Sequence, residues 1–468
     1  MNQDNNDKGS PLTVIVTALV ALTVLSLLPW DEFTGHRLKN FSLISDLVPE
    51  SDKTYITHEE IDPALAELDT AATAAAVPAD TAADGASQLA FPAELPEDFT
   101  APMTADSVVL IEDYSGGRYP AMLRSALAQA VTRPVRIAVT GDSYIEGDIL
   151  TQDIRAGLQD RYGGSGVGYM AAYSAFPGFR QSVRQSGQGW TEHDMRKSAS
   201  DQLKPLQGVY YTAGVGAEAT FKGSHRPAHT DAWDRSTILY VAPADGTITV
   251  TTDAAADRVY PVTASTRLQQ LTVDGHTTKF SFKTDVTGLK VAGVWLDSPT
   301  GVYVDCMSMR GNSGISHRGL DVETCTQMRE FVPYDLIILE FGINALSSAQ
   351  SDYSAYANAM VQAVDRIRAI YPDAVIMLMG IGDRGQKQNG TVGSLHTAPA
   401  MVRAQRDVAR RTGSMFWDTR QAMGGSGSVV DWHRRGHVNA DYIHLNHRGG
   451  KALADIFLTS LNRTLSEQ

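Results

Sequence analysis

The chain has 468 residues, of which 43% are hydrophobic and 20% are charged, and its formal net charge is −13. This balance is typical of a globular protein and excludes a chain that is disordered throughout. The acidic surplus and the lack of a dense lysine and arginine run argue against nucleic acid as a partner, because phosphate binding needs a basic surface.

The first distinctive segment is residues 12–30, LTVIVTALVALTVLSLLPW, which contains no charged residue. A helix of about 20 apolar residues crosses the hydrocarbon core of a bilayer. Trp30 stands where interfacial aromatic residues collect, and Asp31 ends the run. We expect an uncleaved membrane anchor within residues 1–30. A cleaved signal peptide is the alternative, disfavoured because no small-residue cleavage site follows the run cleanly.

Residues 31–106 are expected to form a flexible linker. The stretch from about residue 62 to residue 102 is rich in Ala, Asp, Pro and Thr and contains few large apolar side chains. Such a composition cannot bury enough apolar surface to fold.

Folded structure is expected from residue 107, and residues 107–180 form the first part of an α/β domain. Residues 135–139 are apolar and β-branched, which predicts a buried strand. Gly141-Asp142-Ser143 forms a turn, and residues 149–162 have apolar side chains at helical spacing. This order places Ser143 at the carboxyl end of a strand, where open α/β sheets bind their ligands.

Residues 181–300 have a different pattern. Short alternating runs such as STILYVAP, GTITVTTD and TKFSFKTD are separated by Gly, Asp and Pro. This spacing predicts a β-sandwich or jelly-roll module inserted into the α/β domain.

Residues 301–468 return to alternating strands and helices. Strands are expected at 334–342, 374–382 and 414–418, and helices at 354–371, 398–413 and 449–461. This rhythm predicts an α/β domain with a parallel, doubly wound sheet.

Four short motifs occur at predicted strand ends or in the loops that follow them. They are GDS at 141–143, RGNSGIS at 310–316, FGIN at 341–344 and DYIH at 441–444. In this order they resemble the sequence blocks of the SGNH (GDSL-type) hydrolases. The resemblance implies a flavodoxin-like, three-layer fold and a serine esterase that needs no metal or organic cofactor.

The residue chemistry supports the same reading independently. A serine hydroxyl is a weak nucleophile and needs a general base within hydrogen-bond reach. His444 can serve as that base if a carboxylate fixes its tautomer, and Asp441 lies three residues before it. We therefore predict a catalytic triad of Ser143, His444 and Asp441. The structural alternative is that Asp441 only caps the helix that follows.

The resemblance also implies three donors for the developing oxyanion: the backbone N–H groups of Ser143 and Gly314 and the side-chain amide of Asn344. Gly311 is the competing assignment for the second donor. A glycine suits this position because it lets the backbone approach the substrate closely.

Several other residues are expected to be structural. Glu146 and Asp148 favour the start of a helix, and His447 is expected to lie near the triad without reacting. His433 and His437 lack the remaining features of a zinc site. Cys306 and Cys325 are the only two cysteines, and whether they form a disulfide is left open. Trp190, Trp233 and Trp295 are candidates for sugar contact, although core packing is the more common role of such residues.

Longer segments, among them SGVGYMAAYS, GVYVDCMSMRGNSGIS and FWDTRQAMGGSGSVVDW, resemble bacterial peptidoglycan O-acetylesterases with a carbohydrate-binding-like β module. The resemblance implies removal of acetyl groups from the C6 hydroxyl of N-acetylmuramic acid. With the anchor, it implies an inner-membrane protein whose catalytic domain faces the periplasm. A polysaccharide O-acetyltransferase with the same triad and a non-catalytic cell-wall-binding protein are the alternatives.

Overall fold

The computed structural model describes residue 65 and residues 108–197, 203–388 and 390–466. The chain divides into two compact units, residues 1–58 and 59–468, and the described residues all belong to the second. The expected anchor lies outside the described residues, as does the expected linker apart from residue 65. No helix in the described part of the chain combines the length and the apolar character needed to cross a membrane.

The central element is a six-stranded sheet with the strand order β1-β17-β14-β13-β2-β12. Five of its strands are parallel, and β1 pairs antiparallel with β17 at one edge. Counted in chain order, the parallel strands follow the doubly wound order 2-1-3-4-5, so the predicted α/β fold class is confirmed. The strands are β1 (Glu112–Asp113), β2 (Pro134–Gly141), β12 (Gly301–Ser308), β13 (Leu336–Glu340), β14 (Val375–Met379) and β17 (Met415–Trp417).

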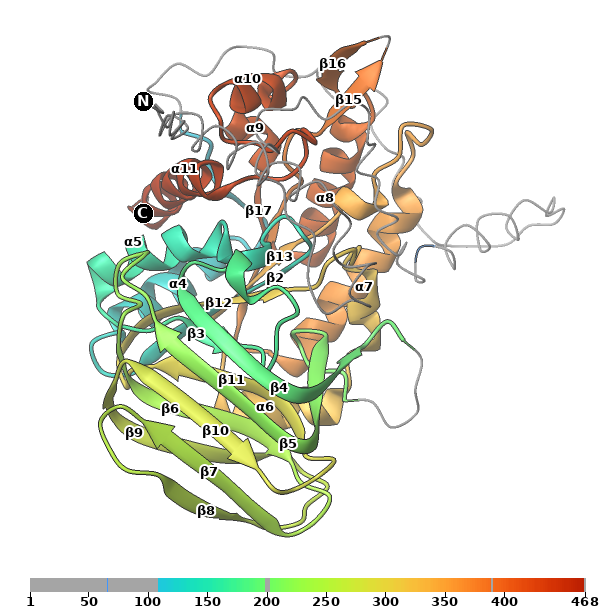
Figure 1. The fold of residues 1–468 in the computed structure, drawn as a ribbon. Coiled ribbons are helices and arrows are strands. Elements are labelled where there is room, and N and C mark those ends of the chain that lie inside the picture. The colour runs from blue at the N-terminus through green and yellow to red at the C-terminus, as the bar shows by residue number, and fades with distance from the viewer. Residues whose placement is uncertain (1–64, 66–107, 198–202, 389, 467–468) are drawn as a thin grey trace, which may run out of the picture. The chain divides into compact units, whose positions relative to one another are not determined.

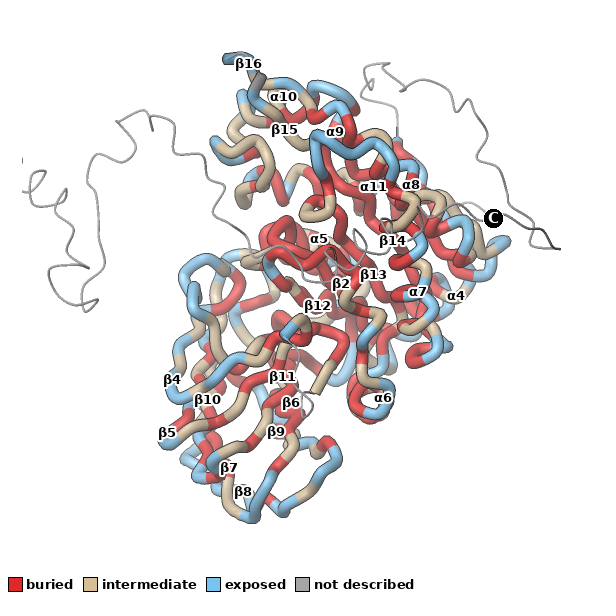
Figure 2. Tube along the Cα trace, turned by 90° about the vertical axis from the view of Figure 1, so that its right-hand side faces the viewer, coloured by how far each residue is buried: buried red, intermediate tan, exposed pale blue. Residues whose placement is uncertain are grey.

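The central strands form because their sequences are almost continuously apolar. β13 reads LIILE and β14 reads VIMLM, and every residue of both is buried. Helices cover parallel sheets on both faces, which favours such runs over an alternating pattern. Figure 2 shows the buried residues concentrated along these strands.

Helices cover the two faces of this sheet (Figure 1). On one face α11 packs against α4 and α5, and on the other α7 packs against α6 and α8. The larger helices are α4 (Arg118–Ala128), α5 (Thr151–Tyr162), α6 (Val322–Phe331), α7 (Ser354–Ile370), α8 (Ala398–Thr412) and α11 (His447–Ser466). Two shorter ones, α9 (Thr419–Met423) and α10 (Ser428–Arg434), precede the DYIH motif.

Strands β3 to β11 form a second, antiparallel sheet of nine strands with its own hydrophobic core. Hydrogen bonds join all nine, and β5 pairs with β4, β10 and β11. Whether this region is a sandwich or jelly-roll domain with the bounds 181–300 stays a prediction. The strands are β3 (Gly168–Met170), β4 (Val183–Asp194), β5 (Val209–Gly223), β6 (Trp233–Val241), β7 (Gly246–Thr252), β8 (Arg258–Val262), β9 (Gln269–Thr277), β10 (Lys279–Thr284) and β11 (Lys290–Asp297).

A buried carboxylate joins the two sheets. Asp305 lies within β12 of the first sheet and is fully buried. It accepts hydrogen bonds from the backbone N–H of Tyr169 at 2.9 Å and from Nε1 of Trp295 at 2.8 Å, both in the second sheet. Tyr334 donates its hydroxyl to the same carboxylate at 2.8 Å. Three donors on one buried carboxylate fix how the second sheet meets the edge strand of the first.

Candidate active site

Ser143 occupies the turn that directly follows β2. The carboxylate of the preceding residue, Asp142, accepts the backbone N–H of Tyr144 at 2.9 Å and so closes this turn. Strand β13 runs beside β2 with Glu340 opposite Gly141, which brings the FGIN loop next to Ser143. The site therefore lies between the first and third parallel strands in chain order, where the doubly wound sheet changes direction and ligands bind.

Ser143, His444 and Asp441 are brought together in one line of hydrogen bonds. The Oγ atom of Ser143 lies 2.9 Å from Nε2 of His444. The Nδ1 atom of His444 lies 2.7 Å from Oδ2 of Asp441. These distances are those of a hydroxyl, a general base and an orienting carboxylate.

The DYIH turn is held by the same carboxylate. Oδ1 of Asp441 accepts the backbone N–H groups of Ile443 at 2.9 Å and His444 at 3.0 Å. Tyr442 adopts a positive φ of 57°, and its carbonyl accepts the N–H of Gly385 at 2.8 Å. Burial alone raises the pKa of Asp441, but the hydrogen bonds from His444 and the turn outweigh it, so the pKa lies below its usual value. Asp441 is therefore ionised at neutral pH and can stabilise an imidazolium.

Asn344 reaches the nucleophile turn from the loop after β13. Its Nδ2 donates to Oδ2 of Asp142 at 3.0 Å and to the carbonyl oxygen of Asn312 at 3.0 Å. Arg384 donates to the carbonyls of Ile343 and Leu346 at 3.2 and 3.1 Å, which fixes the backbone around Asn344. The amide is thus oriented from both sides.

The structure argues against Gly314 as the backbone oxyanion donor. Its N–H already donates to Oδ1 of Asn312 at 2.7 Å, and Phe341 fills the space beside its Cα. Gly311, the competing assignment, is buried and has a φ of 75°. Within the described part of the chain, no hydrogen-bond partner is found for the backbone N–H groups of Ser143 and Gly311. These two N–H groups are free to bind an oxyanion.

A second acid lies behind the nucleophile turn. Glu340 is 1% exposed, and its Oε2 has no hydrogen-bond partner among the described residues. Burial, and then the negative charge of Asp142, raise the pKa of Glu340 well above its usual value. The folded protein therefore favours the neutral acid form of Glu340, a residue that sequence reasoning did not single out.

Asp148 anchors the segment after the nucleophile turn through a buried ion-pair network. It pairs with Arg155 of α5 and, at 3.0 Å, with Arg180 from the loop before β4. Ser182 also donates its hydroxyl to Asp148 at 2.6 Å. Burial opposes ionisation, but the two guanidinium groups lower the pKa of Asp148 to about 2. The expectation that this residue is structural agrees with the contacts, although ion pairing rather than a helix dipole explains them.

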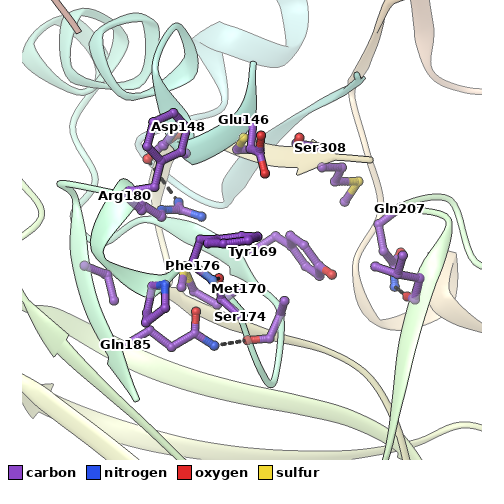
Figure 3. Close-up of a pocket in the computed structure, with 18 of the residues that line it drawn as sticks. Glu146, Asp148, Tyr169, Met170, Ser174, Phe176, Arg180, Gln185, Gln207 and Ser308 are labelled. Carbon is purple, nitrogen blue, oxygen red and sulfur yellow. Dashed lines mark hydrogen bonds and ion pairs between the residues drawn. The ribbon is translucent and has the colours of Figure 1, made fainter. Parts of the chain in front are cut away.

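A cavity of about 130 Å³ lies beside this network (Figure 3). Its walls come from the segment Glu146–Asp148, which follows the nucleophile turn, from the end of β12 at Cys306–Ser308, and from residues of the second sheet and its loops. Ser308 donates its hydroxyl to the carbonyl of Asp142 at 3.0 Å, and Glu146 forms an ion pair with Arg310, the neighbour of Gly311. The cavity therefore adjoins both segments that carry the free N–H groups.

The tryptophans that the sequence offered for sugar contact have structural roles. Trp233 and Trp295 are fully buried, so neither contacts a sugar. Trp190 is half-buried and donates Nε1 to the carbonyl of Glu218 at 2.8 Å. Cys306 and Cys325 are both free thiols, and burial raises the pKa of Cys306 to about 11.

The histidines outside the triad make structural contacts. His433 contacts the carbonyl of Val438, and His437 packs on Trp432. His447, at the start of α11, lies 3.2 Å from Nε2 of Gln152. The described residues include no group of three or more His, Cys, Asp or Glu side chains placed to hold a metal ion.

Comparison with known proteins identifies the type of domain. Residues 291–452 match the GDSL-like Lipase/Acylhydrolase family, a segment that contains Asn344, Asp441 and His444 but not Ser143. No curated protein sequence matches the chain significantly.

Solved structures give the fold. A peptidoglycan O-acetylesterase aligns over 76% of this chain and 99% of its own, with 23% identity and a TM-score of 0.63. A family two carbohydrate esterase from Cellvibrio japonicus covers 61% of this chain and 98% of its own, with 12% identity and a TM-score of 0.25. A Bacillus subtilis protein covers 64% of this chain and 98% of its own, with 12% identity and a TM-score of 0.30. The first of these establishes a shared fold.

Proposed function

Since the chain carries a GDSL-like lipase/acylhydrolase domain and is a carboxylic ester hydrolase, we propose that it removes O-acetyl groups from a cell-envelope polysaccharide. The proposed substrate is peptidoglycan acetylated on the C6 hydroxyl of N-acetylmuramic acid. The observation that carries the proposal is the continuous line from Ser143 Oγ through His444 to Asp441. The fold shared with a peptidoglycan O-acetylesterase supports this choice of substrate.

In the first half of the proposed reaction, Ser143 Oγ attacks the acetyl carbonyl carbon while Nε2 of His444 takes the hydroxyl proton. Asp441 keeps the Nδ1 proton in place and stabilises the imidazolium. The carbonyl oxygen becomes an oxyanion, which binds the N–H groups of Ser143 and Gly311 and the amide of Asn344. His444 then gives its proton to the C6 oxygen of the sugar as the C–O bond breaks.

In the second half, a water molecule attacks the acetyl-serine. His444 takes a proton from this water, and the second tetrahedral intermediate collapses to acetate and free Ser143. Each proton that His444 accepts is returned, so the enzyme needs no cofactor for this chemistry. Asn344 must release one of its present partners to reach the oxyanion, and the carbonyl of Asn312 is a neutral acceptor that is easier to leave than the Asp142 carboxylate.

The test follows acetate release by the full chain and by Ser143→Ala from O-acetylated peptidoglycan and from acetylated xylan. Serine-dependent release from peptidoglycan, with much less from xylan, is the expected result. Turnover of an aryl acetate without release from peptidoglycan would contradict the substrate. In that case acetyl transfer between glycans is assayed with a labelled acetyl donor.

We further propose that residues 12–30 anchor the enzyme in the inner membrane with the catalytic domain in the periplasm. The support is the uncharged run of 19 residues. Fractionation of cells that express the full chain, compared with a chain beginning at residue 31, tests it. Recovery of both forms in the soluble fraction would contradict the anchor.

A further inference from the structure

Two aromatic side chains stand out on the surface beside the nucleophile turn. Phe176 is 66% exposed and Phe179 is 42% exposed. No other Phe, Tyr or Trp in the described part of the chain is exposed. Exposed aromatic surface is unfavourable in water and commonly marks a binding site.

The loop that carries both residues is fixed against the catalytic machinery. The ring of Phe179 lies so close to Gly147 that a Cβ there would collide with it. The same ring is 6.4 Å from His447, three residues after the catalytic histidine. Arg180 ties the end of the loop to Asp148 at 3.0 Å. The Phe179 ring is therefore held beside the segment that follows the nucleophile turn, and the backbone N–H of Phe179 donates to the carbonyl of Phe176 at 3.1 Å.

The cavity next to these rings contains polar groups that lack partners. Tyr169 and Gln207 both line it and are 4% and 1% exposed. Neither the Tyr169 hydroxyl nor Oε1 of Gln207 has a hydrogen-bond partner among the described residues. Buried polar groups are nearly always paired, so an unpaired acceptor and an unpaired hydroxyl in the wall of one cavity can serve the polar groups of a ligand. Figure 3 shows Phe176, Tyr169 and Gln207 around this cavity.

We propose that Phe176, Phe179 and this cavity form a subsite for an N-acetylated sugar ring of the glycan, next to the ring that carries the O-acetyl group. The inference rests on the proposed function and specifies which part of the substrate the enzyme recognises. A cavity of about 150 Å³ holds a molecule of benzene size, so this cavity of about 130 Å³ has room for the acetamido group while the sugar ring lies against Phe176.

The chemistry of the walls matches an acetamido sugar. The C–H-rich face of a pyranose packs on the negative face of an aromatic ring such as that of Phe176. An acetamido group offers one N–H donor and one carbonyl acceptor. Oε1 of Gln207 can accept the first, and the hydroxyl of Tyr169 can donate to the second. A neutral xylose unit has no such group, so the subsite favours amino-sugar glycans over xylan.

The first test measures binding by calorimetry with the full chain carrying Ser143→Ala. The probe is a tetrasaccharide of alternating N-acetylglucosamine and N-acetylmuramic acid. Phe176→Ala is expected to raise Kd at least about tenfold. Phe176→Tyr keeps the ring, and its Kd is expected to stay within about twofold of the parent value. Val259→Ala, which changes an exposed residue of β8 at the far edge of the second sheet, is the matched control.

Equal binding by Phe176→Ala and the Ser143→Ala parent would overturn the subsite. A second probe, the same tetrasaccharide with free amines in place of its acetamido groups, is expected to bind at least about tenfold more weakly. Equal affinity for both probes would overturn the assignment of the acetamido group. Because Phe176 is largely exposed, its replacement does not threaten the fold.

The activity test uses the Ser143 enzyme and compares kcat/KM for O-acetylated peptidoglycan with kcat/KM for an aryl acetate. Phe176→Ala is expected to lower this ratio at least about tenfold. If the enzyme releases no acetate from peptidoglycan while Phe176→Ala still weakens tetrasaccharide binding, the proposed function fails and the subsite stands. An unchanged ratio, with acetate released normally, would overturn the subsite and leave the function intact.

Discussion

The imidazole of His444 lies 2.9 Å from the hydroxyl of Ser143, although 301 positions separate the two residues in the chain. Their meeting depends on two glycines at the start of α11. A Cβ at Gly450 would collide with the carbonyl of Ile149, and a Cβ at Gly449 would collide with the carbonyl of His437. Glycine at both positions lets α11 approach the nucleophile segment and present the DYIH turn to Ser143.

Ser143→Ala is expected to abolish ester hydrolysis, since the hydroxyl that lies 2.9 Å from Nε2 of His444 is removed. Loss of a triad nucleophile typically lowers kcat by about 10⁶. Hydrolysis of an aryl acetate measures the effect. Ser281→Ala, on strand β10 of the second sheet, should retain wild-type activity. Substantial residual turnover in Ser143→Ala would rule out this nucleophile.

Asp441→Asn is expected to lower kcat by about 10⁴, because an amide favours the wrong tautomer of His444. It also changes acid stability. The pKa of Asp441 is lowered in the folded state, so its contribution to stability is present above its unfolded pKa of 3.8 and is lost as the pH falls through the lower folded value. Urea unfolding of both proteins at several pH values should show a stability difference that shrinks below pH 3.8. A pH-independent difference would contradict this account.

Asn344→Ala is expected to lower kcat by about 10²–10³ with a small change in KM, as for other oxyanion donors. The amide binds the oxyanion mainly in the transition state, so its removal lowers kcat and leaves KM nearly unchanged. Steady-state kinetics with an aryl acetate provide the measurement. Asn462→Ala on α11, where the side chain contacts Arg161, is the surface control. A large rise in KM with unchanged kcat would instead indicate a role in substrate binding.

Asp148→Asn is expected to destabilise the protein by about 3–5 kcal/mol, because it leaves the fully buried Arg155 without its counter-ion. The folded pKa of Asp148 is about 2, below the unfolded value of 3.8. The full loss of stability should therefore be seen at neutral pH, and the stability difference between the two proteins should shrink as the pH falls toward 2. Denaturant unfolding reports it. Asp365→Asn, which breaks an exposed pair with Arg368, should cost less than about 1 kcal/mol.

Glu340→Gln is expected to stabilise the protein increasingly as the pH rises above 4.5. The folded state raises the pKa of Glu340 well above that value, so folding must hold a proton that the unfolded chain releases. Glutamine is neutral in both states and removes this cost. Unfolding free energies of the two proteins at pH 4, 7 and 9 test the trend. A constant difference across this range would show that Glu340 is ionised in the folded state.

The sequence predicted the central sheet, and it singled out the three residues that the structure brings together, because both rest on local patterns. The apolar runs at 334–342 and 374–382 contain β13 and β14, and the helices expected at 354–371 and 398–413 correspond to α7 and α8. The predicted start of the helix after the nucleophile was wrong by two residues. Gly147 and Asp148 both have positive φ, which delays α5 until Thr151.

Other features depend on contacts that no local pattern contains. Gly311 and Gly314 lie three residues apart in the same motif. They differ because the N–H group of Gly314 donates to the side chain of Asn312. Glu340 ends an apolar strand, and a glutamate at such a position is usually exposed to solvent. In this structure the turn after β2 covers it. The aromatic residues at the cavity, Phe176 and Phe179, lie in a loop without any motif, so no local pattern distinguishes them from the other aromatic residues.

The pairing of β2 with β12 has a consequence for how the chain folds. These neighbours are separated in sequence by the whole second sheet, so their direct closure spans a very long loop. Once β3 has paired with β11, Gly168 and Leu296 are adjacent, and the open loop becomes roughly fourfold shorter. Each doubling of loop length costs about 0.6 kcal/mol of chain entropy, so prior pairing of β3 with β11 lowers the free-energy cost of closing this loop by about 1.2 kcal/mol. The second sheet thus lowers the entropic barrier to assembly of the sheet edge beside the nucleophile, in addition to forming one wall of the cavity.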